Sequence, residues 1–167
     1  MSLRSYIQDH PRILVWSWEV GSRLFKAIGP LLERIGIERA SSIIHPPEYF
    51  FKKLLFDCQT CGQCVLHYTG MTCPMTCPKQ LRNGPCGGVT ATGKCETDPD
   101  MDCVWYKALE RLDRTPYGKE KTRMNSPVDW RLEGMSSYVT YGTGRDMIGV
   151  GNDPVVHYAD EVIWGQK

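Results

Sequence analysis

The sequence has 167 residues, of which 41% are apolar, and its formal net charge is +1. This length suits one domain, or one small domain with appendages. Positive and negative side chains are nearly balanced, so the chain offers no broad basic surface, and we expect no nucleic-acid partner.

The first residues lack an apolar run followed by a small-residue cleavage site, so they do not form a typical signal peptide. The most apolar stretch, residues 13–32, is interrupted by three charged residues and broken at Gly29-Pro30. A helix that spans a bilayer needs about 20 mostly uncharged residues. We therefore predict no transmembrane segment and a cytoplasmic location.

Residues 1–57 are predicted to be helical. We expect one helix to end at Gly29, a second to run over residues 30–35 and a third over residues 47–56. In the first helix, apolar residues recur in steps of three and four, which marks one helix face. That face comprises Ile13, Trp16, Val20, Leu24, Ala27 and Leu31.

Three roles for this face remain open. It could pack against the rest of the chain, or it could be a docking surface for a partner protein. It could also lie on a membrane surface, because basic side chains accompany it. We interpret residues 1–57 as a docking segment.

Residues 58–114 form a cysteine-rich module followed by a helix. All eight cysteines lie here, among glycines and prolines that favour loops and tight turns over regular elements. The helix is expected over residues 104–112, with Asp100 or Asp102 as its N-terminal cap.

Residues 115–167 are predicted to form an extended arm that lies across another surface. Short extended pieces are expected at residues 137–141 and 155–158, and the aromatic residues of this region argue against simple disorder. The predicted fold is thus a small α protein with an irregular, metal-stabilised module. It has N-terminal helices, a loop-rich core of eight cysteines and an extended C-terminal arm.

So dense a group of cysteines indicates either a secreted disulfide framework or an intracellular metal module. Without an export signal, reduced thiols and bound metal are favoured. The candidate metal ligands are Cys58, Cys61, Cys64, Cys73, Cys77, Cys86, Cys95 and Cys103.

The spacing of the first three cysteines carries the most information. A C-x2-C-x2-C run reaches three corners of a [4Fe–4S] cluster, whereas a single zinc ion usually takes one C-x2-C pair and a distant second pair. Gly62, inside the run, permits close approach of the backbone. One or two [4Fe–4S] clusters are therefore predicted, with zinc as the alternative.

Eight thiolates could complete two four-cysteine sites. We place Cys58, Cys61 and Cys64 on one centre. The other centre would draw on Cys77, Cys86 and Cys95. Cys73 and Cys103 would complete one site each, and the spacing does not show which completes which. His67 lies near the first run and could replace a cysteine, but packing is the default for a lone histidine. No catalytic residue and no organic cofactor site stands out in this chain.

Three segments of the sequence together resemble a known family: residues 58–64 (CQTCGQC), 70–79 (GMTCPMTCPK) and 82–88 (RNGPCGG). Residues 103–105 and 129–134 (DWRLEG) are also similar to it. The family is the cysteine-rich, MetV-type partner subunit or C-terminal domain associated with methylenetetrahydrofolate reductase. The similarity covers roughly residues 50–147.

The resemblance implies a non-catalytic, accessory role in one-carbon metabolism. In that family the catalytic subunit is a barrel that carries FMN or FAD, and these 167 residues have no room for a barrel of about 250 residues. It implies zinc or iron–sulfur centres held by the cysteines. The partners implied are the flavin-containing reductase subunit and an electron-donor protein.

Three functions follow from this reading. The first is an iron–sulfur subunit that relays electrons to the flavin of the reductase. The second is a structural zinc subunit that stabilises or docks the same enzyme without a redox role. The third is an accessory protein in corrinoid or folate methyl transfer, which would need a zinc ion with an open coordination position.

Overall fold

A computed structural model describes residues 10–121, 125 and 127–147. Over these residues the chain is mostly helical, with four α-helices, several short 3-10 turns and no β-strand beyond two isolated bridges. The prediction of a small α protein is thereby confirmed at this level. The predicted extended piece at residues 155–158 lies outside the described residues.

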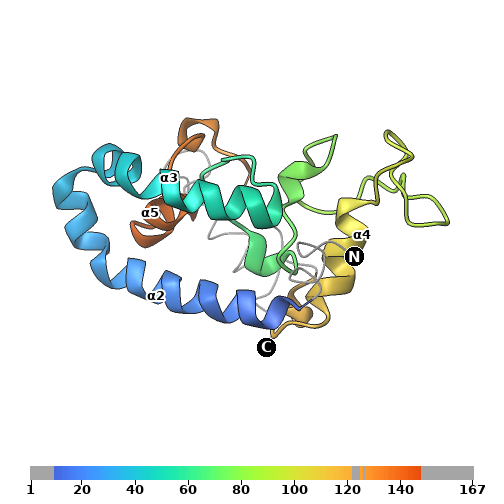
Figure 1. The fold of residues 1–167 in the computed structure, drawn as a ribbon, viewed down its shortest axis with the longest axis horizontal. Helices are drawn as coiled ribbons and strands as arrows, with labels where there is room; N and C mark the ends of the chain where they lie inside the picture. The colour runs from blue at the N-terminus through green and yellow to red at the C-terminus, as the bar shows by residue number, and fades with distance from the viewer. Residues whose placement is uncertain (1–9, 122–124, 126, 148–167) are drawn as a thin grey trace, which may run out of the picture.

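Helices α2 (Pro11–Ile35) and α3 (Ile37–Phe56) form an antiparallel hairpin, with the reversal at Gly36. Helix α5 (Ser137–Gly142) packs against both of them, although it is distant from them in sequence (Figure 1). Helix α4 (Val104–Leu112) lies at the other end of the molecule. The 3-10 turns span Leu66–Tyr68, Pro74–Thr76, Gly118–Glu120, Trp130–Leu132 and Arg145–Met147.

The predicted break at Gly29-Pro30 is wrong, because α2 continues through it to Ile35. Gly29 is instead a site of close helix contact: a Cβ there would lie 2.4 Å from the carbonyl oxygen of Gly142 in α5. Pro30 is exposed, so water can satisfy the carbonyl oxygen that its missing N–H leaves without a donor.

Helix α3 likewise begins earlier than predicted, at Ile37, and includes Pro46 and Pro47. Both prolines are exposed, so the two carbonyl groups that lose their helical donors can bond water. Side chains on both sides of the prolines hold the helix to α5: Ser41 Oγ accepts from Ser136 N at 2.6 Å, and Glu48 accepts from Ser136 and Ser137.

The extended piece predicted for residues 137–141 is also wrong, since this segment is helix α5. Ser136 caps the helix, because its hydroxyl accepts from the backbone N–H of Val139. Val139 and Thr140 are fully buried against the helical hairpin. This part of the predicted arm is therefore a folded piece of the core.

Helix α4 has the predicted bounds, Val104–Leu112, and the expected apolar face, with Val104, Ala108 and Leu112 buried. Its predicted cap is wrong: Cys103 occupies the N-cap position, with no side-chain cap bond. Asp102 instead pairs with Lys94 and Lys107 at 2.6 and 2.5 Å.

The core buries the face of α2 opposite to the predicted stripe. Val15, Trp18 and Leu32 are at most 5% exposed, whereas Ile13 is 72% and Trp16 65% exposed. The whole stripe of six apolar residues faces away from the core. Within residues 10–121, 125 and 127–147 the stripe is therefore not packed into the core, while docking to a partner and contact with a membrane surface stay predictions.

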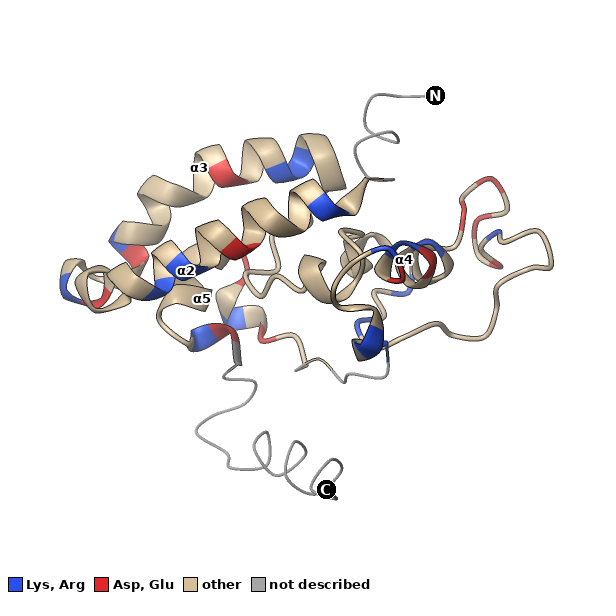
Figure 2. Cartoon of the chain, turned by 90° about the horizontal axis from the view of Figure 1, so that it is seen from below, with Lys and Arg blue, Asp and Glu red and all other residues tan. Residues whose placement is uncertain are grey.

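Charged residues of both signs are interspersed along α2 and α3 (Figure 2). Among the residues described, none of the helices combines the length and the apolar character that crossing a bilayer requires.

Candidate metal centre

Four cysteines line one cavity directly after α3. They are Cys58, Cys61, Cys64 and Cys73. The rest of the lining comes from α3 and from Leu66, Met75, Arg82, Met135 and Ser137. The first three belong to the predicted run. Cys73 lines the same cavity, whereas Cys103 does not.

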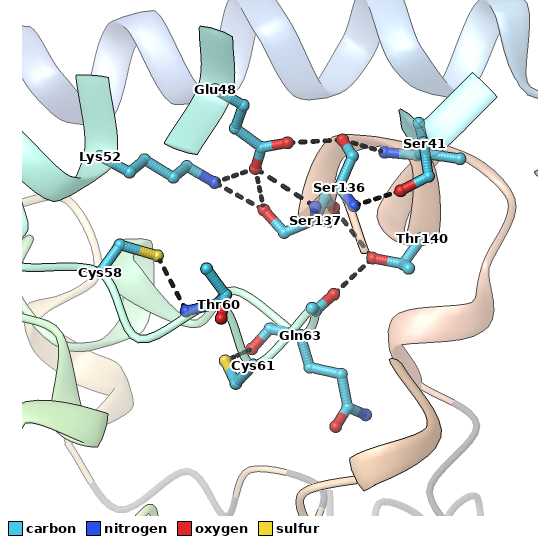
Figure 3. A network of polar contacts seen from close by, with 12 residues as sticks. Ser41, Glu48, Lys52, Cys58, Thr60, Cys61, Gln63, Ser136, Ser137 and Thr140 are labelled. Carbon is cyan, nitrogen blue, oxygen red and sulfur yellow. Dashed lines mark hydrogen bonds and ion pairs between the residues drawn. The ribbon is translucent and has the colours of Figure 1, made fainter. Parts of the chain in front are cut away.

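Several residues of the loop that carries Cys58, Cys61 and Cys64 form hydrogen bonds with residues 129–146. Gly134 N donates to Thr60 O at 2.9 Å, and Thr140 Oγ1 donates to Gly62 O at 2.5 Å (Figure 3). The side chain of Gln63 accepts from Asp129 N at 2.7 Å and donates to Asp146 O at 2.8 Å. These contacts fix the backbone on which the cysteines sit.

Gly62 has the role that its place in the run predicts, with a different neighbour. Its φ is +71°, and a Cβ would lie 2.1 Å from the carbonyl oxygen of Leu132. The close approach is thus to residues 129–134, another segment of the family resemblance, which clamps residues 58–64.

Burial and the proximity of the cysteines to one another shift the pKa values of their thiols. Burial, together with the charges of neighbouring cysteines, raises the pKa of Cys58 to about 11 and that of Cys73 to about 12. Burial also raises the pKa of Cys64. A raised pKa means that the thiols favour their neutral form. A bound metal cation would reverse this, because metals bind cysteine as the thiolate and lower the cost of deprotonation.

Two cationic side chains border the same cavity. Lys52 Nζ donates to Glu48 Oε1 at 2.6 Å and to Ser137 Oγ at 2.5 Å (Figure 3). Burial alone would lower the pKa of Lys52, but the charges of Cys64 and Glu48 raise it above its ordinary value. Arg82 donates to Gln63 O at 2.8 Å and lies 3.9 Å from Cys61 Sγ.

Burial would raise the pKa of Glu48, yet the charge of Lys52 and three hydroxyl and ammonium hydrogen bonds bring it below its ordinary value. The pair is therefore charged at neutral pH. Sequence reasoning missed Glu48, Lys52 and Arg82. The i,i+4 spacing of Glu48 and Lys52 on the helix that leads into the cysteines was the available signal, although such pairs are usually exposed.

This donor set fits an anionic metal–thiolate centre. Four soft thiols share a cavity, and fixed positive charges border it, as a centre with four thiolate ligands requires. In the described part of the chain, no group of three or more histidine, cysteine, aspartate or glutamate side chains is arranged to hold a metal ion as it stands. The four thiols share a cavity but do not converge on one point.

The other four cysteines are arranged differently. Cys77 follows the turn Pro74–Thr76, Cys86 is exposed, and Cys103 is the N-cap of α4. Cys95 is joined to the α4 entrance by backbone bonds, Cys95 N to Met101 O and Cys103 N to Gly93 O, both 2.9 Å.

The sulfur atoms in this second group bond to neighbouring side chains. Cys86 Sγ lies 3.6 Å from Glu96 Oε1, and Cys95 Sγ lies 3.1 Å from Thr97 Oγ1. The bond to Thr97 lowers the pKa of Cys95. No described contact brings the four sulfur atoms of this group together.

His67 is packed among aromatic rings, 5.1 Å from Trp18 and 3.8 Å from Tyr68 between ring centroids. It does not line the cavity of the four thiols. This placement agrees with the packing interpretation of the lone histidine.

Comparison with known proteins gives one match. Residues 38–131, more than half of the chain, match a family model described as "Methylene-tetrahydrofolate reductase C terminal". No curated protein and no solved structure matches. The matched range includes α3, all eight cysteines and α4, and it confirms the resemblance seen in the cysteine motifs. The chain belongs to the family of methylene-tetrahydrofolate reductase C-terminal domains.

Proposed function

We propose that this chain is an accessory, non-catalytic subunit of a methylenetetrahydrofolate reductase and that it relays electrons through iron–sulfur chemistry to the flavin of the catalytic subunit. The observation that carries the metal part is the cavity lined by four thiols and bordered by Lys52 and Arg82. Family membership supports the reductase as the partner.

Cys58, Cys61, Cys64 and Cys73 would hold the first [4Fe–4S] cluster. A cluster bound there supplies one-electron transfer. Leu66, Phe56 and Met75 pack around the cavity and exclude water from it, which raises the influence of nearby fixed charges on the centre. Cys77, Cys86, Cys95 and Cys103 would hold a second centre, for which zinc is the alternative.

The outward stripe of α2 is the surface that we propose for docking to the catalytic subunit. It runs from Ile13 to Leu31 on helix α2, which is about 27 Å at 1.5 Å per residue. Trp16 and Leu24, 65% and 58% exposed, lie within it. Large exposed apolar patches rimmed by polar groups mark protein interfaces. Basic residues along one edge, Arg12, Arg23, Lys26 and Arg34, suit a partner with an acidic rim.

Metal analysis tests the first half of the proposal. Protein purified without oxygen should contain iron and acid-labile sulfide, and its visible absorbance should bleach on addition of dithionite. When reduced protein is mixed with recombinant flavin-loaded reductase, the flavin absorbance at its oxidised band should fall. Colourless protein with stoichiometric zinc and no sulfide would contradict the electron-transfer role, and metal-free protein with paired sulfurs would contradict both metal readings.

Binding to the recombinant reductase tests the second half. Leu24→Glu places a charge in the middle of the stripe and should weaken binding at least about tenfold, because a desolvated carboxylate there has no partner. The matched control is Tyr106→Glu on α4, which is 55% exposed and lies off the stripe. Equal affinity of the two variants would exclude α2 as the docking surface.

A further inference from the structure

Lys52 is an unusual lysine, because its side chain is buried beside the cavity of the four thiols. The residue is only 7% exposed. Burying an ammonium group is costly unless it is paired and hydrogen-bonded. Glu48 Oε1, 2.6 Å from Nζ, supplies the paired charge, and Lys52 also lines the cavity of the four thiols.

The surroundings of Lys52 hold the ammonium in place. Glu48 and Ser137 accept its hydrogen bonds, and the ring centroids of Tyr138 and Trp18 lie 4.6 and 5.1 Å from Nζ. An ammonium has three N–H donors. Glu48 and Ser137 accept two of them among the described contacts, and Lys52 is at the same time part of the lining of the four-thiol cavity.

The charge of Glu48 is shared with helix α5. Its carboxylate accepts from the hydroxyls of Ser136 and Ser137 and from the backbone N–H of Ser137. Figure 3 shows these donors on the side of Glu48 that faces α5, with Lys52 beside the cysteine loop. Glu48 thus holds the Lys52 ammonium in place, and Lys52 still lines the cavity.

Arg82 supplies a second positive charge from another part of the chain. It is 7% exposed, and its guanidinium bonds to the carbonyl of Gln63 and lies 3.9 Å from Cys61 Sγ. Lys52 comes from α3 and Arg82 from the segment after the turn Pro74–Thr76, so two separate elements bring cations to one cavity.

We propose that Lys52 is the positioning residue that sets the reduction potential of the centre held by Cys58, Cys61, Cys64 and Cys73, with Glu48 as the opposing charge that moderates it. This inference rests on the proposed iron–sulfur function. Each electron added to a thiolate-bound centre increases its negative charge, and a fixed cation in a poorly solvated site stabilises that reduced form. Arg82 adds to the same effect from the side of Cys61.

Two variants of the full-length protein test the proposal, because they change the local charge in opposite directions. Lys52→Met removes a positive charge and should lower the midpoint potential, by about tenfold in the reduction equilibrium or about 59 mV for one electron. Glu48→Gln removes a negative charge and should raise it. The readout is a redox titration of the cluster followed by electron paramagnetic resonance.

Damage to the structure alone would move both variants in the same direction, and that outcome would overturn the proposal, as would two unchanged potentials. Lys121→Met is the matched control, since Lys121 is also ion-paired, at 2.5 Å to Asp113, and does not line the cavity. If Lys52→Met does not fold, the double variant Glu48→Gln/Lys52→Met should titrate below Glu48→Gln alone.

The metal assay separates this inference from the proposed function. Wild-type protein without a redox-active cluster contradicts the proposed function before any variant is compared. Wild-type protein with a cluster whose potential ignores both substitutions contradicts this inference alone.

Discussion

The two groups of cysteines differ in how the protein holds them. The loop of Cys58, Cys61 and Cys64 is bonded to residues 129–146 by backbone and side-chain contacts and is covered by α3 and α5. The segment from residue 84 to Cys103 projects away from the helices (Figure 1) and makes bonds within itself.

The fold already holds the backbone of the first cysteine group in place, whereas the second group would depend more on a bound metal for its order. The first group has its backbone fixed by long-range contacts, so a metal bound there would have little ordering left to do. In the described part of the chain most hydrogen bonds of residues 84–103 stay within that segment, so the free energy of binding a metal would also have to order the loop. Stability should therefore respond differently to changes in the two regions.

The largest effect should come from a cysteine of the first group. Cys73→Ser removes a buried proposed ligand from the cavity and should lower the melting temperature by about 10 °C or more, since losing a structural metal costs several kcal/mol. Cys86→Ser, at an exposed position, should lower it by less than half as much. Calorimetry with metal quantitation measures both. Equal shifts would show that the two sites contribute alike.

An intermediate effect is expected from glycines with positive φ. Gly62→Ala should cost about 3 kcal/mol, because the new Cβ clashes with the Leu132 carbonyl in addition to the unfavourable φ of +71°. Gly84→Ala meets open space at φ +124° and should cost about 1 kcal/mol. Denaturant unfolding of the metal-loaded variants gives the two values, and similar losses would mean that the 129–134 clamp does not hold the loop.

The smallest effect should be local and should follow removal of metal by a mild chelator from the second group alone, of which Cys86 is exposed. Trypsin should then cut after Lys94, in the projecting loop, about tenfold faster than in the loaded protein, because that loop opens by about 1.4 kcal/mol more readily. Cutting after Arg23, within α2, should change much less. Mass spectrometry of timed digests resolves the two sites. A parallel rise at both would show that the helices also depend on metal.

Sequence reasoning succeeded where local signals and tertiary packing agree. Helix α4 has the predicted bounds because its apolar spacing matches its buried face. It failed at Gly29, where a residue that favours a helix end serves a close contact with Gly142, a residue more than 100 positions away. Residues 137–141, rich in β-branched and aromatic side chains, were predicted as extended, but the cap at Ser136 and burial against the hairpin favour the helix.

The sequence suggests the candidate ligands, and their role stays a prediction, but it does not reveal the residues around them. The cysteine run is a local pattern, and the eight residues that it and the later motifs supply are proposed as ligands on that basis. The grouping of Cys73 with the run and the burial of Lys52 arise from long-range contacts that no spacing reveals. The sequence identifies the α2 stripe as one apolar face of the helix. It does not show which of the two apolar faces of α2 packs into the core.

The contact between Gly62 and Thr140 has a consequence for how the protein is made. The two residues are 78 positions apart. At about 5–20 residues per second, the ribosome adds Thr140 roughly 4 to 16 s after Gly62. During that interval the nascent thiols stand uncovered, open both to assembly factors and to oxidants. Once residues 129–146 emerge, they can form the hydrogen bonds that hold the loop in the folded protein.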